Sequence, residues 1–371
     1  MKKITPFFIV FLLLTHCFSM AQTSDLFLFI GTYTTKTSEG IYVYRFNTQT
    51  GEATPVTVAK GIKNPSFQAI SPDHRFLYSV AEMNGGAVSA FAIDKNSGEL
   101  TLLNAQSAGG NGPCHVAVDK TGKWVLVGNY GGGSLSILPV QPDGSLGKAT
   151  QTIQHEGKSA NAQRQEKPHV HSINIAPNNH DIFVPDLGTD KIMTYQLDIK
   201  SGQLSAGTPP FWAATPGAGP RHFTVHPSGK FAYVIQELNA TITGFHYKKG
   251  KLDAFQTVKT LPDNYTGNKW CADIHISPDG QFLYGSNRAH ESLVIFSIHQ
   301  KKGQLTYVGH QDVLGKTPRN FMIDPTGKWV LVANQDSDNV VIFSRDMKTG
   351  KLTPTGREIK VSMPVCLNVL N

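Results

Sequence analysis

Short runs of alternating apolar and polar residues, separated by turn residues, recur along most of the chain. In one example, PRHFTVHPSGKFAYVIQE (Pro220 to Glu237), two runs rich in β-branched and aromatic residues flank the turn HPSG. This alternation predicts β-strands rather than helices, and the Pro-x-Gly turn predicts a hairpin. Similar hairpins begin at Pro65, Pro113, Val170, Cys271 and Pro318.

A third apolar run follows each of these six hairpins, and the unit repeats roughly every 50 residues, as in β-propellers built from four-stranded blades. Residues 26–52 contain LFLFIGTYTT and GIYVYRFNTQTGE, which match the second and third runs but lack a first. The C-terminal PVCLNVL matches a first run alone. We therefore predict an all-β, seven-bladed β-propeller, in which the C-terminal strand joins the N-terminal blade and removes the open sheet edges.

The first 21 residues predict a secretory signal peptide, because a basic start is followed by an apolar run and by small residues before Gln22. His16 directly before Cys17 argues against a lipoprotein anchor. No later stretch is apolar enough to span a membrane. We expect an exported protein, periplasmic or secreted, with residues 22–371 forming a single propeller domain.

Composition adds few constraints. The chain has 371 residues, of which 40% are hydrophobic and 16% charged, as in ordinary globular proteins. The net charge of +7 is not gathered into a basic stripe, which argues against a nucleic-acid partner. The cysteines beyond the leader are Cys114, Cys271 and Cys366, an odd and scattered set that predicts buried, unpaired thiols.

Charged residues gather at the ends of the predicted hairpins, whereas the strand centres are apolar. In a propeller blade the first strand lines the central channel and the second runs antiparallel to it, so the start of one and the end of the other meet at the same face. We predict a polar pocket there. The candidate catalytic residues are His171, Arg221, Glu237 and Arg288, and the candidate substrate-binding residues are His169, His222, Asp186, Arg319 and Asn287.

Structural roles compete with these functional ones. Arg221 and Glu237 could form a salt bridge within a blade, and the asparagines could satisfy backbone groups where strands end. Glu82 could be an ordinary charge at the rim. The long insertion from Gln151 to Lys167, which contains Arg164, is a candidate loop beside the pocket.

The residue types favour acid–base chemistry on an anionic or carbonyl substrate. Guanidinium groups bind phosphate or carboxylate and can stabilise an oxyanion, while His171 or Glu237 could accept a proton. The chain has no G-x-S-x-G elbow and no Walker or dinucleotide fingerprint. His169 and His171 lack companions at metal-ligand spacing. We therefore expect neither a metal nor a cofactor.

Long motifs resemble the seven-bladed lactonase family, which includes the propeller-type 6-phosphogluconolactonase and the fungal carboxy-muconate cyclase. The resemblance covers essentially the whole chain after the leader. It is carried by GPCHVAVDKTGKWVLVGNYGGGS, KPHVHSINIAPNNHDIFVPDLGTDKI, GAGPRHFTVHPSGKFAYVIQELNATITGF, SPDGQFLYGSNRAHESLVIF and FMIDPTGKWVLVANQDSDNVVIF.

This resemblance implies hydrolysis of a sugar lactone without a cofactor, as in the conversion of 6-phosphogluconolactone to 6-phosphogluconate. In the cyclase branch the active site comprises a His, two Arg and a Glu. By motif these fall on His171 (or His169), Arg221, Glu237 and, for the second Arg, Arg288 rather than Arg319.

Two features keep alternatives open. The leader predicts export, and phosphorylated sugars are scarce outside the cell membrane, so the substrate could be an unphosphorylated aldonolactone or another anionic sugar derivative. The same pocket would also suit a non-catalytic propeller that binds a sugar acid or a protein partner, or a cyclase that abstracts a proton. The sequence does not determine the oligomeric state.

Overall fold

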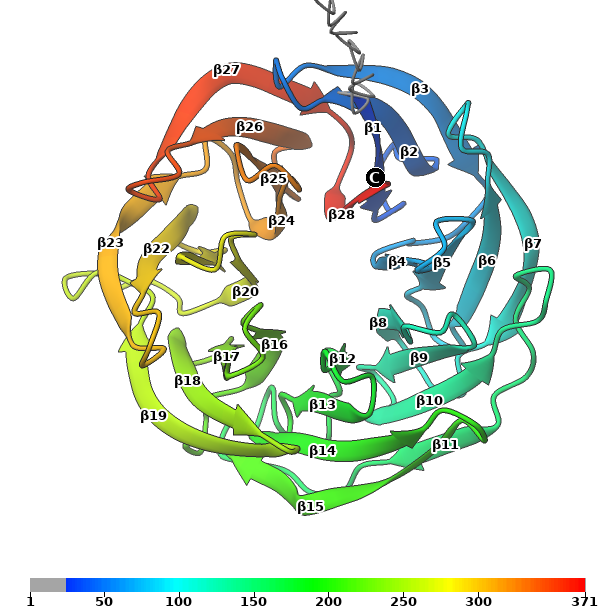
Figure 1. The fold of residues 1–371 in the computed structure, drawn as a ribbon, viewed down its shortest axis with the longest axis horizontal. Helices are drawn as coiled ribbons and strands as arrows, with labels where there is room; N and C mark the ends of the chain where they lie inside the picture. Colours follow the sequence, from blue (N-terminus) through cyan, green and yellow to red (C-terminus); the bar gives the residue numbers. More distant parts are fainter. Residues whose placement is uncertain (1–24, 371) are drawn as a thin grey trace, which may run out of the picture.

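The computed structural model describes residues 25–370, which form seven four-stranded antiparallel sheets arranged in a ring around a central channel (Figure 1). The predicted all-β, seven-bladed propeller is thereby confirmed. The predicted leader, residues 1–21, lies outside the described residues. Within residues 25–370 no helix is long and apolar enough to cross a membrane.

Each blade is ordered from the channel outward. The first three blades are β28 (Pro364–Leu370), β1 (Asp25–Thr32), β2 (Gly40–Asn47) and β3 (Ala53–Lys60); β4 (Gln68–Ile70), β5 (Phe76–Ala81), β6 (Ala87–Ile93) and β7 (Leu100–Ser107); and β8 (Pro113–Val118), β9 (Trp124–Asn129), β10 (Ser134–Pro139) and β11 (Gln151–Gln154). The fourth is β12 (Asn174–Ile175), β13 (Asp181–Asp186), β14 (Lys191–Asp198) and β15 (Gln203–Ala213).

The last three blades follow the same order. They are β16 (Pro220–Val225), β17 (Phe231–Gln236), β18 (Thr241–Lys248) and β19 (Lys251–Lys259); β20 (Cys271–Ile276), β21 (Phe282–Asn287), β22 (Ser292–Ile298) and β23 (Leu305–Asp312); and β24 (Pro318–Ile323), β25 (Trp329–Asn334), β26 (Asn339–Arg345) and β27 (Leu352–Lys360).

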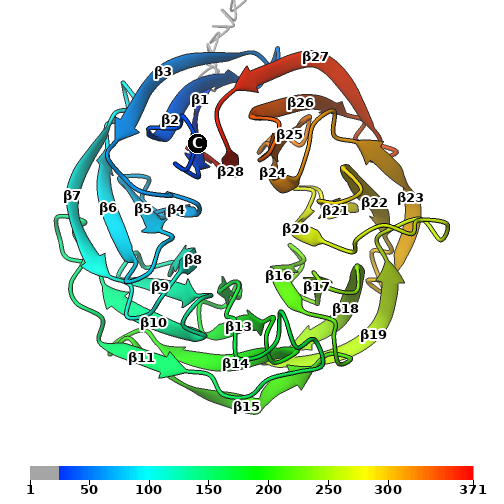
Figure 2. The same cartoon turned by 180° about the vertical axis from the view of Figure 1, so that it is seen from behind.

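The C-terminal strand closes the ring. β28 pairs antiparallel with β1, for example Leu28 with Val369 and Ile30 with Leu367. Figures 1 and 2 show this red strand beside the blue one at the channel, so the first and last residues of the fold share one blade. The predicted closure is confirmed. The three cysteines Cys114, Cys271 and Cys366 are buried and unpaired, as expected.

The hydrophobic core lies between neighbouring blades. Second strands such as β5 and β17 are buried along their whole length because a blade packs on each face, whereas the outermost β3 and β7 consist mainly of exposed and half-buried residues. Blade-to-blade contact also uses a repeated aromatic–glycine pair. The ring of Phe231, at the start of β17, packs on Gly303 in the next blade, and the Tyr233 hydroxyl donates to the Gly303 carbonyl at 2.6 Å.

Candidate active site

A β-bulge at the start of the first strand aims the candidate residues away from the sheet. In the β16–β17 pair, Pro220 opposes Gln236 and His222 opposes Ile235, so Arg221 is the extra residue. Cys114, Arg319 and Val365 occupy the same bulged position in their blades. Because a bulge redirects the side chain of the extra residue, several blades point a side chain into the same end of the channel.

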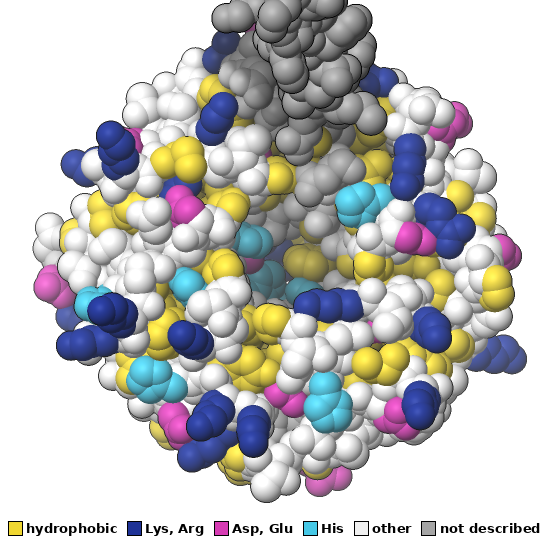
Figure 3. All heavy atoms as spheres, viewed as in Figure 1, with side chains coloured by type: hydrophobic (Ala, Val, Ile, Leu, Met, Phe, Trp, Pro, Cys, Tyr) yellow, Lys and Arg dark blue, Asp and Glu magenta, His cyan; other side chains and the backbone are white. Residues whose placement is uncertain are grey.

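These side chains surround a cavity of about 280 Å³. The predicted rings of residues converge on it, and four of the candidates, His171, Arg221, His222 and Arg319, contribute to its wall. The other lining residues are Tyr33, Ser66, Phe67, Glu82, Cys114, Asn320 and Val365. The face of the ring seen in Figure 3 has a central hollow in which histidine side chains are visible. A wall that combines apolar side chains with a few converging polar ones is typical of small-ligand sites.

Glu237 lies beside this cavity at the centre of an arginine cluster. Its carboxylate is 2% exposed and contacts Arg221 (Nε to Oε2, 3.0 Å), Arg288 (Nη2 to Oε2, 2.9 Å) and Arg164 (Nη2 to Oε1, 2.5 Å). Burial alone would raise the pKa of the Glu237 carboxyl, but Arg288, Arg221 and Arg164 together lower it to about 2. Glu237 is therefore an anion that anchors three guanidinium groups.

The predicted Arg221 is placed at the wall of the cavity by this anion and by the neighbouring blade. Its Nη1 donates to the Ala272 carbonyl at 2.7 Å, and its side chain is 3% exposed. Burial and the nearby Arg288 lower the pKa of Arg221 to about 10, which still leaves the guanidinium charged at neutral pH. A buried, fixed cation of this kind can stabilise negative charge that develops on a substrate.

The two candidates for the second arginine occupy different places. Arg288 bonds Glu237 and the Cys271 carbonyl, the latter at 3.1 Å, and does not line the cavity. Arg319 does line it, and its guanidinium donates to the Tyr33 hydroxyl at 2.8 Å. Arg288 therefore supports Glu237, whereas Arg319 faces the space that a substrate would occupy.

Tyr33 and Glu82 complete the wall next to Arg319. The Tyr33 hydroxyl donates to Glu82 Oε2 at 2.9 Å, and Ser66 donates to the same oxygen. Sequence reasoning left Glu82 open and missed Tyr33. Aligning the ends of the second strands would have identified Tyr33. It directly follows β1, just as Glu82 follows β5 and Glu237 follows β17.

His171 lies between the cavity and Glu237. Its Nε2 is 3.9 Å from Glu237 Oε2, and its Nδ1 is 3.9 Å from Cys114 Sγ. Burial, with further contributions from Arg221, His222 and Arg319, lowers the pKa of His171 well below its ordinary value. The imidazole is therefore neutral at physiological pH.

His222 belongs to a second polar network on the channel side of the cavity. Its Nδ1 lies 2.7 Å from Asp273 Oδ1, and Asp273 Oδ2 lies 2.8 Å from His275 Nε2. Asn320 donates to the same Oδ2 at 2.5 Å. Burial and Arg221 lower the pKa of His222 to about 4 although Asp273 opposes this shift, so the imidazole is neutral above that pH.

Besides Glu237 and Arg288, three further sequence candidates lie outside the cavity wall. His169 stacks on the Tyr130 ring and bonds the Tyr130 carbonyl at 2.9 Å. Asp186 accepts the backbone N–H groups of residues 169, 188 and 189 and pairs with His155 at 2.7 Å. Asn287 bonds the Thr260 carbonyl at 2.9 Å. These contacts hold strand ends and loops, and none of the three residues lines the cavity.

The predicted insertion does border the site. After β11 the chain crosses to the mouth, and Arg164 reaches both Glu237 and the Tyr130 hydroxyl, the latter at 3.2 Å. The loop is attached through the His155–Asp186 pair and through Ser159, whose hydroxyl bonds Asp190 at 2.6 Å. Arg164 thus brings a third guanidinium to Glu237 from a different blade.

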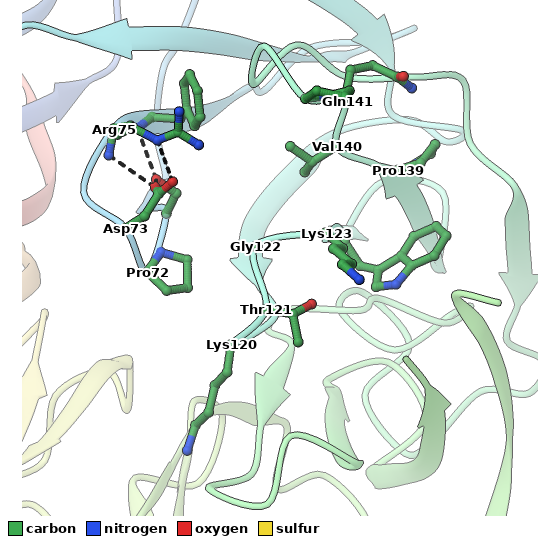
Figure 4. Close-up of a pocket in the computed structure, with 14 residues that line it drawn as sticks. Pro72, Asp73, Arg75, Lys120, Thr121, Gly122, Lys123, Pro139, Val140 and Gln141 are labelled. Carbon is green, nitrogen blue, oxygen red and sulfur yellow. Dashed lines mark hydrogen bonds and ion pairs between the residues drawn. The ribbon is translucent and has the colours of Figure 1, made fainter. Parts of the chain in front are cut away.

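A larger groove of about 1190 Å³, open to solvent, lies between the β4–β7 and β8–β11 blades (Figure 4). Its charged side chains do not converge. Asp73 and Arg75 pair with each other at 2.6 Å, and the Lys120 amine bonds the Pro177 carbonyl. We therefore assign the candidate site to the smaller cavity. In the part of the chain that the structure describes, no three His, Cys, Asp or Glu side chains are grouped so as to hold a metal ion.

Comparison with known proteins agrees with the fold. A family model of the seven-bladed β-propeller lactonases matches residues 27–369. A 6-phosphogluconolactonase of Bacillus subtilis is 40% identical over 298 residues, which are 79% of this chain and 84% of that protein. One of Formosa agariphila is 40% identical over 306 residues, 80% and 86% of the respective chains.

A solved structure agrees as well. The periplasmic gluconolactonase of Pseudomonas aeruginosa superposes with a TM-score of 0.89 at 34% identity, over 94% of this chain and 99% of that one. The match extends over the whole ring of blades and therefore includes the segments that build the cavity. The chain belongs to the seven-bladed β-propeller lactonase family.

Proposed function

We propose that the protein hydrolyses a sugar lactone to the corresponding sugar acid, with a reaction of the 6-phosphogluconolactonase type. The observation that carries this proposal is the pair of guanidinium groups, Arg221 and Arg319, at the wall of one small buried cavity beside neutral imidazoles. A lactone carbonyl needs a cation where negative charge develops and a base that can accept a proton from water. Both kinds of group meet in this cavity.

Arg221 is the group that polarises the carbonyl in this proposal. Glu237 fixes its Nε and Ala272 fixes its Nη1, so the guanidinium does not have to reorganise as the tetrahedral oxyanion forms. Arg319, which lies on β24 two blades further round the ring, binds an anionic or hydroxyl group of the same substrate. Glu237 favours the charged form of Arg221 but is itself a weak base, because three guanidinium groups hold its oxygens.

The charge around the cavity suits an anionic substrate. Arg164, Arg221, Arg288 and Arg319 face the carboxylates of Glu82, Glu237 and Asp273, which leaves a local charge of +1 when the imidazoles are neutral. A phosphate or a product carboxylate would balance this excess. The predicted leader supports export, and we extend the proposal to an unphosphorylated aldonolactone as the substrate met outside the cell membrane.

The test is the effect of Arg221→Ala on lactone hydrolysis. Loss of a preorganised oxyanion donor should lower kcat/KM by roughly 10²–10³-fold, mainly through kcat. The control Arg45→Ala removes an exposed arginine that stacks on Phe27 far from the cavity and should leave the rate unchanged. Acid release from 6-phosphogluconolactone and from gluconolactone measures both variants. Undiminished hydrolysis by Arg221→Ala would refute the assignment.

A further inference from the structure

The described residues contain two buried histidine–aspartate pairs with nearly the same geometry but different surroundings. Both have Nδ1 2.7 Å from a carboxylate oxygen, His155 from Asp186 and His222 from Asp273. In the first pair the other ring nitrogen of His155 is also occupied, because it lies 2.9 Å from the Tyr195 hydroxyl. That pair is fully satisfied within the protein and therefore structural.

The ring of His222 is held differently. It lines the candidate cavity, and among residues 25–370 its Nε2 has no hydrogen-bond partner. Because the Asp273 carboxylate accepts a hydrogen bond from Nδ1–H, the neutral ring carries its lone pair on Nε2. Asp273 is itself fixed, since His275 and Asn320 bond its second oxygen. The pair thus presents an oriented, unprotonated nitrogen to the cavity.

Neither of the other two candidate bases is placed so well. The oxygens of Glu237 are bound by three arginines, and these lower its pKa to about 2, which makes the carboxylate a poor proton acceptor. The two ring nitrogens of His171 face Glu237 and the Cys114 thiol, each at 3.9 Å. No carboxylate lies within hydrogen-bond distance to orient the His171 ring.

We propose that His222 is the general base that takes a proton from the attacking water, and that Asp273 is its positioning residue. This inference rests on the proposed lactone hydrolysis. The water oxygen bonds to the carbonyl carbon, its proton passes to His222 Nε2, and the carbonyl electron pair forms an oxyanion beside Arg221. Collapse of the oxyanion breaks the ring C–O bond, and the departing oxygen takes the proton from the imidazolium. The net change is one lactone and one water to one hydroxy acid.

The pH dependence follows from the groups that face His222. These are His115 of β8, His171, Arg221 of the same strand, and Asp273 and His275 of β20. Burial and Arg221 lower the pKa of His222 to about 4, so the ring is unprotonated at neutral pH. The logarithm of kcat/KM should therefore fall with unit slope only below about pH 4.

The experiment compares His222→Asn with the matched control His226→Gln. His226 lies on the turn of the same hairpin and bonds the Gly280 carbonyl, a contact that glutamine can keep. We expect His222→Asn to lower kcat by roughly 10²–10⁴-fold with little change in KM, and the control to be unaffected. Added imidazole should restore part of the activity of His222→Ala and none to Arg221→Ala.

Asp273→Asn tests the positioning residue. It should lower kcat while keeping KM, because the imidazole loses the carboxylate that fixes its tautomer. The inference would be overturned, and the lactonase proposal left intact, if His222→Asn kept the wild-type rate and the same fall of kcat/KM below about pH 4. The inference would also be overturned if the fall of kcat/KM at low pH disappeared in His171→Asn and not in His222→Asn. If the wild type opens no lactone above background, the proposed function itself fails.

Discussion

At the scale of single residues, the site is organised by one buried anion. Glu237 forms ion pairs with Arg164, Arg221 and Arg288, which come from three different places in the chain. Its negative charge compensates these guanidinium groups and so allows them to be buried. The sequence placed Arg221 and Glu237 together because they lie at the two ends of one hairpin. It could not place Arg164, whose position depends on the path of a long loop.

Removing the Glu237 charge should lower the free energy of unfolding and should also reduce the dependence of that free energy on pH. Glu237→Gln leaves buried guanidinium groups without their anion, and should lower the free energy of unfolding by about 3–5 kcal/mol at pH 7. The carboxyl has a folded pKa of about 2 against an ordinary 4.5, so its contribution is present above pH 4.5 and is lost as the pH falls toward 2.

Urea unfolding between pH 3 and pH 7 measures this difference. The gap in stability between wild type and Glu237→Gln should narrow as the pH falls. Glu39→Gln, which breaks an exposed pair with Lys60, is the control and should not alter the unfolding midpoint measurably. A gap of constant size across the pH range would contradict the account of Glu237.

At the scale of elements, the alternation of residues predicted the strands and their turns but not the bulges. A bulged residue such as Arg221 or Arg319 has the same sequence neighbours as an ordinary strand residue, so the pattern cannot show that its side chain leaves the ladder. Contacts between the first strands of adjacent blades are easier to predict from the sequence. His222 and Asp273 hold equivalent positions in neighbouring first strands, and their contact follows from the repeat once the register is known.

The aromatic–glycine pairs between blades should make a glycine such as Gly303 more costly to replace than a glycine with open space around it. Gly303 has a φ of +72°, and a Cβ there would lie 2.6 Å from the Phe231 ring. Gly229 has a φ of +66° with open space around it. Gly229→Ala should cost roughly 1–2 kcal/mol from left-handed strain alone. Gly303→Ala should cost roughly 1–3 kcal/mol more from overpacking. Equal losses in chemical denaturation would argue against the pair as an interblade contact.

At the scale of the whole molecule, closure joins residues at opposite ends of the sequence. The sequence predicted this from an unmatched first run at one end and unmatched second and third runs at the other. The site depends on it, since Tyr33 and Val365 of the closing blade line the same cavity as His171 and Arg221. The motif match favoured Arg288 over Arg319 as the second arginine of the site, whereas Arg319 is the one that lines the cavity. Both residues lie within one residue of a strand end, so the sequence pattern alone does not distinguish them.

Truncation after Met363 tests this closure. It removes β28 and leaves the β1 edge unpaired, so we expect an aggregation-prone chain without a cooperative unfolding transition. A permuted chain in which residues 361–371 precede residue 25 supplies the strand from the other end and should restore folding. Thermal unfolding followed by circular dichroism, with light scattering, distinguishes the two. A truncated chain as stable as the full one would contradict the closed ring.

The most direct test of lactone opening in this cavity is the initial rate of acid release from 6-phosphogluconolactone and gluconolactone, measured against the uncatalysed rate at the same pH. We predict a saturable rate above background for at least one of these lactones, and its loss in both Arg221→Ala and His222→Asn. Acid release that never exceeds the uncatalysed rate with either lactone, from a folded protein, would contradict the account.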